Sequence, residues 1–189
     1  MHDAPIHRAA KRHSANGFTL LETMIALLVL FVGILGLAAM LGDALAYMRG
    51  SQDDFIAQQK AEEAAEAIFT AKYTNGITWA QVSNNSAANP AGLFLVGPQP
   101  ILQPGPIDGL VGTVADAGQP PETILTPGPD GKLGTADDVQ LPLTEFTRTI
   151  TIGNVAGNPN LRTIQIQVFY NTGRFNRTYT MNTYISAFN

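Results

Sequence analysis

A run of twenty consecutive uncharged residues, 23–42, constrains the fold of this chain more than any other feature. As an α-helix it is about long enough to cross the ~30 Å hydrocarbon core of a bilayer. The seventeen residues at the N-terminus carry one acid, Asp3, against three basic residues, Arg8, Lys11 and Arg12. Basic residues before a span stay in the cytoplasm. We therefore expect a single membrane-spanning helix with the C-terminal part of the chain outside the cytoplasm.

The remaining composition excludes several classes of function. The chain has 189 residues, no cysteine and a formal net charge of −4. Disulfides, thiolate metal sites and thiol nucleophiles are therefore ruled out. No cluster of Lys and Arg occurs beyond the first twelve residues, so we expect no nucleic-acid partner. The length suits a long helix followed by one smaller domain.

The junction between the polar leader and the apolar run has a specific order of residues. Gly17 is followed by Phe18, Thr19, Leu20, Leu21 and Glu22. This order closely resembles the class III signal of type IV prepilins. The resemblance implies that a prepilin peptidase removes residues 1–17, cutting between Gly17 and Phe18 on the cytoplasmic side. It also implies that the same enzyme methylates the new amine of Phe18 and that the apolar helix is retained. An ordinary secretory signal is the alternative, in which Gly36, Ala38, Ala39 and Gly42 would supply a weak small-residue cleavage site.

Glu22 is a carboxylate at the threshold of the membrane segment. A charged side chain in hydrocarbon costs roughly 2.5 to 3.5 kcal/mol on insertion scales, so it needs a partner or a function. In a filament of parallel helices, Glu22 of one subunit could pair with the Phe18 amine of another and fix the axial stagger. The alternative is a residue that reaches water at the interface or caps the helix start.

Removal of the leader would leave a chain with little catalytic chemistry. All three histidines, His2, His7 and His13, precede Gly17, and the remaining residues include fourteen acidic and eight basic side chains. Without His or Cys, acid–base or nucleophilic catalysis would rest on carboxylates, Lys, Tyr or hydroxyls. No arrangement of these residues stands out, so we expect no enzyme.

After the filament-core segment, 18–42, residues 43–75 form an amphipathic continuation of the helix. They are rich in Ala, Glu, Gln and Lys, and no proline occurs between the apolar run and Pro90. We predict that the helix extends to about Tyr73, with Asn75 and Gly76 as its stop.

Residues 76–143 form a variable region rich in Pro and Gly, in which we expect short elements and many turns. Within it, residues 127–139 (PGPDGKLGTADDV) gather Asp130, Asp137 and Asp138 around two glycines. Calcium prefers carboxylate and carbonyl oxygens from flexible loops. The segment is similar to the acidic calcium loops of major pseudopilins of type II secretion, which makes calcium a candidate cofactor. Solvated Asx and Gly turns are the alternative.

An upstream segment, residues 104–118 (PGPIDGLVGTVADAG), repeats this skeleton with apparent insertions at Ile107 and Val114. It keeps Asp108 and Asp116, but this alignment places Ala117 opposite the second acid of the downstream pair. We therefore expect a weaker metal site here, or none and only solvated turns.

The C-terminal region, residues 144–189, has the pattern of three β-strands. Its segments 144–152, 161–170 and 176–187 are rich in β-branched and aromatic residues. In the middle strand, apolar Ile164, Ile166 and Val168 alternate with glutamines, so one face is apolar. An antiparallel sheet packed on the amphipathic helix gives an α+β fold, which is the type IV pilin fold by resemblance.

The resemblance implies a function in filament assembly. The pair Gly33 and Gly36 and the C-terminal strands look most like minor pilins of the pilus-modification (PilV-like) type. We expect a minor subunit of a type IV pilus, which would prime or modify the filament. Its partners would be other pilin subunits, the prepilin peptidase/methyltransferase, the inner-membrane assembly platform and membrane lipid. The resemblance places it in the bacterial inner membrane as a single-pass protein before assembly, and afterwards in the pilus at the cell surface. The alternatives are a pseudopilin of a type II secretion system and a single-span anchored calcium-binding or adhesive domain that never polymerises.

Overall fold

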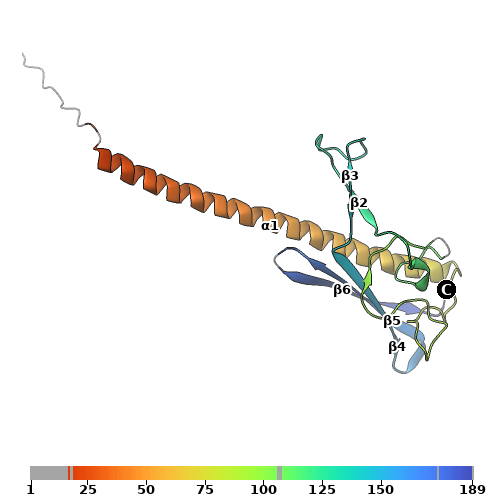
Figure 1. Ribbon diagram of the computed structural model, residues 1–189. Coiled ribbons are helices and arrows are strands. Elements are labelled where there is room, and N and C mark those ends of the chain that lie inside the picture. The colour runs from red at the N-terminus through yellow and green to blue at the C-terminus, as the bar shows by residue number, and fades with distance from the viewer. Residues whose placement is uncertain (1–16, 18, 106–107, 174, 189) are drawn as a thin grey trace, which may run out of the picture. The chain divides into compact units, whose positions relative to one another are not determined.

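The computed structural model describes residues 17, 19–105, 108–173 and 175–188 (Figure 1). The chain divides into two compact units, residues 1–45 and 46–189, and helix α1 (Leu20–Tyr73) runs through both. The second unit, the head, contains the elements that follow α1. These are β1 (Gln99–Pro100), the 3-10 helix η1 (Val114–Asp116), β2 (Thr123–Thr126), β3 (Val139–Pro142), β4 (Phe146–Val155), β5 (Asn158–Asn171) and β6 (Asn176–Ser186).

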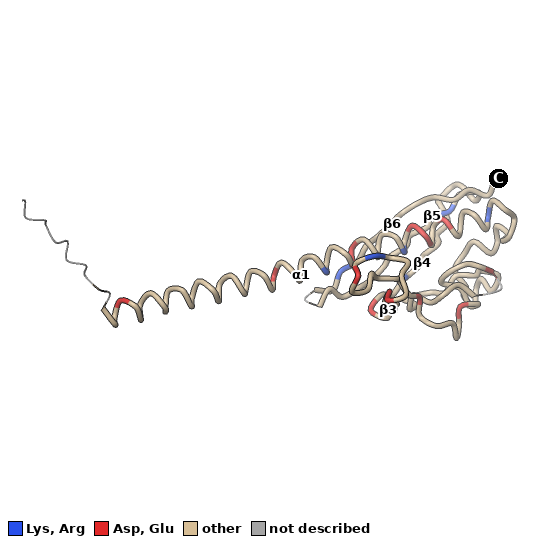
Figure 2. Tube along the Cα trace, turned by 90° about the horizontal axis from the view of Figure 1, so that it is seen from above, with Lys and Arg blue, Asp and Glu red and all other residues tan. Residues whose placement is uncertain are grey.

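The first part of α1 is a regular helix whose large apolar side chains are exposed along its length. By length and composition it could cross a membrane, and its most apolar window has no buried residue. Figure 2 shows an acidic position near the helix start, followed by a long uncharged stretch. Such a surface is stable only in lipid or against other apolar helices.

The end of α1 is set by a left-handed residue at Asn75. Asn75 has a φ of 59°. The N–H of Gly76 donates to the carbonyl of Ala71 at 2.8 Å, and the N–H of Asn75 donates to the carbonyl of Lys72 at 3.2 Å. These two bonds form a Schellman motif, which satisfies carbonyls at the helix end. The expected end of the helix is confirmed.

An antiparallel sheet with strand order β1-β4-β5-β6 packs on α1. Residues 46–73 of α1 contribute Ala57, Ala61 and Ala64, which are fully buried together with Ile164, Ile166 and Val168 of β5. Small alanines let the helix backbone approach the sheet closely, and the alternating residues of β5 fill the space between them. The predicted α+β architecture is confirmed.

The β4–β5 connection is shorter than the sequence suggested. The predicted strands 144–152 and 161–170 leave residues 153–160 between them, but Val155 pairs with Asn158 and the turn holds only Ala156 and Gly157. Gly157 has a φ of 77°, a left-handed conformation that glycine adopts without the steric cost that a side chain would bring. A register shift between Asn154 and Val155 accommodates the irregularity.

The Pro/Gly-rich region contains short elements, as predicted. β1 adds two residues to the sheet beside β4, and β2 and β3 form a separate two-stranded ribbon. In Figure 1 this ribbon projects from the rest of the head, and the acidic segment after β2 forms its tip.

Candidate functional site

The assembly motif begins at the start of α1. Gly17 is exposed, while Phe18 and residues 1–16 lie outside the described residues, so the predicted cleavage and methylation at Gly17 and Phe18 stay predictions. Thr19 caps the helix, because its Oγ1 accepts a hydrogen bond from the backbone N–H of Glu22 at 3.3 Å. Glu22 is therefore the third residue of the first turn, where the free N–H groups of the helix favour a negative charge.

The predicted acidic sites fall on two loops of one design. We call residues 108–116 the first loop and residues 130–138 the second loop; both read D-G-x-x-G-T-x-x-D. In each loop the two glycines have positive φ: 63° and 78° for Gly109 and Gly112, 70° and 88° for Gly131 and Gly134. The same turn therefore occurs twice, 22 residues apart in the sequence.

In the first loop, the carboxylate of Asp116 organises the backbone. It is 5% exposed. Its Oδ1 accepts the N–H of Gly105 at 2.9 Å, and its Oδ2 accepts those of Gly112 and Thr113 at 2.6 and 3.0 Å. Asp108 accepts the N–H of Leu110 at 3.2 Å and the Thr113 hydroxyl at 2.9 Å. In this arrangement both carboxylates accept hydrogen bonds that hold the conformation of the loop.

In the second loop, the corresponding bonds are made at the surface. Asp138 accepts the N–H of Gly134 at 2.7 Å and of Thr135 at 3.2 Å, and Asp130 accepts the N–H of Lys132 at 2.8 Å. The Thr135 hydroxyl lies 2.7 Å from Asp137 and 3.5 Å from both Asp130 and Asp138. All three predicted acids of this loop therefore surround one hydroxyl.

These bonds correct the alignment of the two copies. The sequence comparison placed an insertion at Val114 and matched Asp116 with Asp137. The hydrogen bonds match Asp116 with Asp138 instead, because each accepts the N–H groups three and four residues earlier. Ala115, and not Ala117, stands where the second loop has Asp137.

Both loops offer the hard oxygen donors that calcium prefers. Among the described residues, however, no group of three or more His, Cys, Asp or Glu side chains is arranged to hold a metal ion. The carboxylates are directed at backbone N–H groups and at the central threonine hydroxyls. Calcium binding at these loops therefore stays a prediction.

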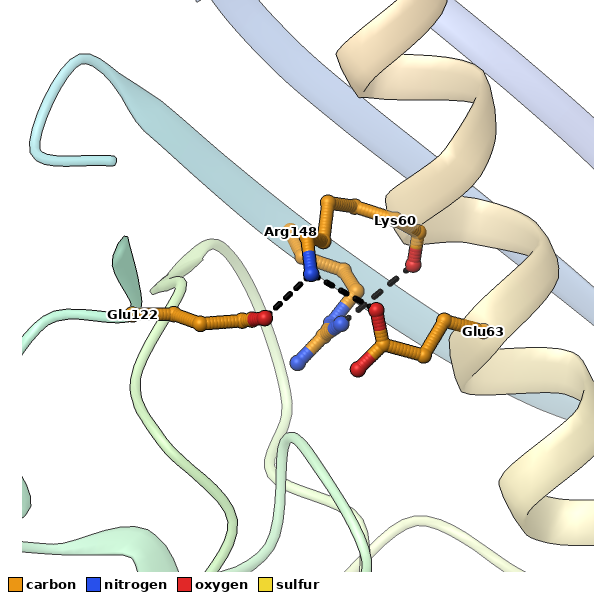
Figure 3. A network of polar contacts seen from close by, with 4 residues as sticks. All are labelled: Lys60, Glu63, Glu122 and Arg148. Atoms are coloured by element: carbon orange, nitrogen blue, oxygen red, sulfur yellow. Dashed lines mark hydrogen bonds and ion pairs between the residues drawn. The ribbon is translucent and has the colours of Figure 1, made fainter. Parts of the chain in front are cut away.

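A buried charge network, which the sequence analysis did not identify, joins α1 to the sheet (Figure 3). Lys60 and Arg148 are 5% and 3% exposed. The Lys60 ammonium pairs with Glu63 at 2.7 Å and with Glu122. An Arg148 guanidinium nitrogen donates to the Lys60 carbonyl at 3.4 Å. The network connects Glu122, the residue before β2, to helix α1 and to strand β4.

Burial and charge act against each other in this network. Burial alone would lower the pKa of Lys60, but its bonds to Glu122 and Glu63 outweigh burial and raise it. Burial lowers the pKa of Arg148, with Glu63, Glu122 and Asp116 acting in the opposite direction. Removing one partner of such a buried group is strongly destabilising, because it leaves the remaining charge buried without compensation.

The comparisons with known proteins agree with the N-terminal motif. The family model described as "Prokaryotic N-terminal methylation motif" matches residues 12–38. No curated protein and no solved structure matches the chain. The motif supports a type IV pilin-like or pseudopilin protein, a family with a structural role that is processed by prepilin peptidase and assembles with other pilins. Together with the apolar helix, it fits a membrane-anchored protein that is later assembled at the surface.

Proposed function

We propose that the chain is a minor subunit of a type IV pilus, cleaved between Gly17 and Phe18, methylated on Phe18, and assembled through its N-terminal helix to prime or modify the filament. One observation supports the proposal most strongly: the methylation motif and the apolar helix overlap in the sequence. The methylation motif over residues 12–38 ends inside a helix that starts at Leu20 and is uncharged over residues 23–42.

The membrane would hold the subunit before assembly. The basic leader favours a cytoplasmic N-terminus and a head outside the cytoplasm. The exposed apolar side chains of α1 would first be covered by lipid and then by neighbouring helices. Gly33, Gly36 and Gly42 leave open space at the positions where a side chain would begin, and small residues of this kind let helices approach closely.

Glu22 would set the register of assembly. It lies in the first turn of α1, one turn after the residue whose amine the peptidase would expose. A carboxylate next to hydrocarbon is stabilised by an opposite charge, and a neighbouring subunit's Phe18 ammonium supplies one. Pairing at one axial offset penalises the other offsets, because they leave a charge without a partner in a low dielectric. The inner-membrane assembly platform would then add subunits at that offset.

A second candidate is a pseudopilin of a type II secretion system. It would share the same N-terminal processing and helix packing. The acidic second loop favours it, because three carboxylates gather around the Thr135 hydroxyl in a segment similar to the calcium loops of that class. Calcium bound there would order the ribbon tip. A non-polymerising anchored domain is the third alternative.

The first experiment measures the mass of the N-terminal peptide of the protein isolated from its own envelope. We expect a peptide that begins at Phe18 and is heavier by one methyl group. An intact leader, or cleavage beyond Gly36, would contradict the proposal and move the function to an anchored or secreted binding domain.

A second experiment tests assembly separately from processing. Glu22→Gln keeps the side-chain size and removes the charge, so the variant should still be processed and methylated at Phe18. It should be depleted from sheared surface filaments relative to the membrane fraction. Glu62→Gln is a matched control, because Glu62 is exposed on the head part of the same helix and bonds only locally to Gln58 in the described chain. Equal filament content of the two variants would contradict the role of Glu22, and recovery from the secretion machinery instead of filaments would favour the pseudopilin.

A further inference from the structure

The two edges of the main sheet differ in how their backbone hydrogen-bonding groups are covered. At the β4 edge, β1 pairs Gln99 with Arg148 and Pro100 with Thr147. Beyond β1, the side-chain amide of Asn84 continues the cover: it donates to the carbonyl of Ile150 and accepts from the N–H of Ile152, both at 2.7 Å. The Asn84 side chain thus makes the hydrogen bonds to β4 that a neighbouring strand would make, beyond the point where β1 ends.

The β6 edge has no such cover among the described residues. The sheet ends at β6, and the isolated bridges of the described chain do not involve it. The N–H of Thr172 donates to the carbonyl of Phe175, and that of Ala187 to the carbonyl of Asn160. Phe175 and Ala187, which flank β6 at its two ends, therefore both belong to hydrogen-bonded pairs. Because hydrogen-bonded pairs alternate in an antiparallel ladder, the odd-numbered residues of β6 also bond to β5. The backbone groups of Thr178, Thr180, Asn182 and Tyr184 therefore face away from the sheet.

This edge also lacks the usual devices that prevent strand pairing. β6 stays in register with β5 through eleven consecutive pairs, without the shift seen in β4. It contains no Pro, no Gly, and a single charged residue, Arg177, near its start. Long, regular, uncharged edges are templates for pairing with another strand. The four outward-facing residues are exposed.

We propose that the free edge of β6 binds an extended segment of a different protein by β-strand addition, through the backbone groups of Thr178, Thr180, Asn182 and Tyr184. Main-chain hydrogen bonds supply affinity in this mode of recognition, and alternate side chains supply specificity.

The side chains on either face of β6 define the chemistry of the incoming strand. On the outer face, Thr180 and Asn182 lie beside the glutamines of β5, and Gln165 donates to the Asn182 side chain at 3.0 Å. On the helix face, Tyr179 and Met181 are partly buried against the core. A matching strand alternates uncharged polar residues with apolar ones and presents the apolar set on the helix side.

A second copy of this chain is the other candidate occupant. In a helical filament, which this step takes from the proposed function, neighbouring copies contact each other through different surfaces, so β6 of one copy would not meet β6 of the next. Pairing of β6 with the β4 edge of a neighbouring copy is blocked, because β1 and Asn84 already cover that edge. We therefore assign the β6 edge to a different protein.

Amide hydrogen exchange tests the proposal residue by residue. The two samples are the full chain purified in detergent and the full chain in its native envelope, read by fragmentation to single amides. In detergent, we expect fast exchange at Thr178, Thr180, Asn182 and Tyr184 and slow exchange at the odd-numbered residues between them. In the envelope, the four fast amides should slow by about tenfold or more. Unchanged fast exchange there would overturn the proposal, as would protection that appears in detergent as the chain is concentrated, which would indicate a second copy.

A backbone variant separates pairing from folding. Thr180→Pro removes an N–H that makes no bond within the sheet, so the melting temperature in detergent should change little, while envelope protection of the other three amides is lost. Thr180→Ala keeps the N–H and should retain that protection. Asn182→Pro serves if Thr180→Pro fails to fold. Retained protection in a folded proline variant would overturn the proposal. The N-terminal mass tests the pilus function independently, since protection of β6 does not require processing at Phe18.

Discussion

The first and second loops have the same turn in different surroundings. In both, an aspartate accepts the N–H groups three and four residues earlier, and two glycines are left-handed. Asp116 is buried in the head and also holds Gly105, whereas the second loop lies exposed at the ribbon tip. The comparison shows that nine residues are enough to specify the turn, while burial decides whether its carboxylates support the fold or remain accessible.

The largest difference between the loops should come from the shared aspartate. Asp116→Ala leaves three backbone N–H groups without their acceptor in a buried site, and each such group costs about 1 to 3 kcal/mol. We expect a loss of roughly 3 kcal/mol or more in the free energy of unfolding. Asp138→Ala exposes its N–H groups to water and should cost about 1 kcal/mol or less. Urea unfolding of the full chain in detergent measures both, and equal losses would mean that burial does not separate the loops.

The central glycines should give the next largest difference. Both Gly112 and Gly134 have left-handed φ, so an added side chain costs about 1 to 2 kcal/mol at each. At Gly112, a Cβ would also lie 2.9 Å from Cδ1 of Ile150, whereas at Gly134 nothing lies within 4 Å. Gly112→Ala should therefore destabilise the head more than Gly134→Ala, by about a further 1 kcal/mol of crowding. A larger loss for Gly134→Ala in the same unfolding assay would contradict this reading of the two environments.

Calcium should act on the second loop and not on the first. If the second loop binds the ion, calcium at ten times its dissociation constant stabilises the folded chain by about 1.4 kcal/mol. We expect the melting temperature to rise at millimolar calcium, and Asp137→Ala to abolish the rise. Asp108→Ala should leave the rise intact, because it alters the loop that lacks a counterpart of Asp137. No rise in the unmodified protein would count against calcium as a cofactor.

The same comparison shows what the sequence could specify. The helix end at Asn75 and the three C-terminal strands follow from local patterns, because a left-handed stop and a period of two are visible in neighbouring residues. The alignment of the loops was wrong at Val114, because short segments rich in Gly and Asp align in several ways and only the hydrogen bonds choose among them.

The buried charges were missed for a related reason. Lys60 lies on a helix rich in charged residues, which resembles a solvated face, and its partner Glu122 is distant in sequence. Arg148 did leave a signal: it occupies an apolar-face position of β4, between Phe146 and Ile150. A charge at that point of a period-two pattern indicates a buried partner, but the pattern alone does not name it.

The smallest predicted effect concerns the extra acid of the second loop. The Thr135 hydroxyl donates to Asp137, and this bond, with further bonds from backbone N–H groups, holds the pKa of Asp137 below its ordinary value. Because the folded-state pKa is lowered, the contribution of Asp137 to loop order is present above the ordinary value and is lost as the pH falls through the lowered one. Thr135→Val should raise the pKa of Asp137 toward the ordinary range, as measured by carboxyl-carbon NMR titration. The first loop has no counterpart of this acid, because Ala115 stands at the position of Asp137 and the Thr113 hydroxyl donates to Asp108 instead. An unchanged pKa of Asp137 in Thr135→Val would show that the threonine hydroxyl is not what lowers it, and that the backbone N–H groups alone do so.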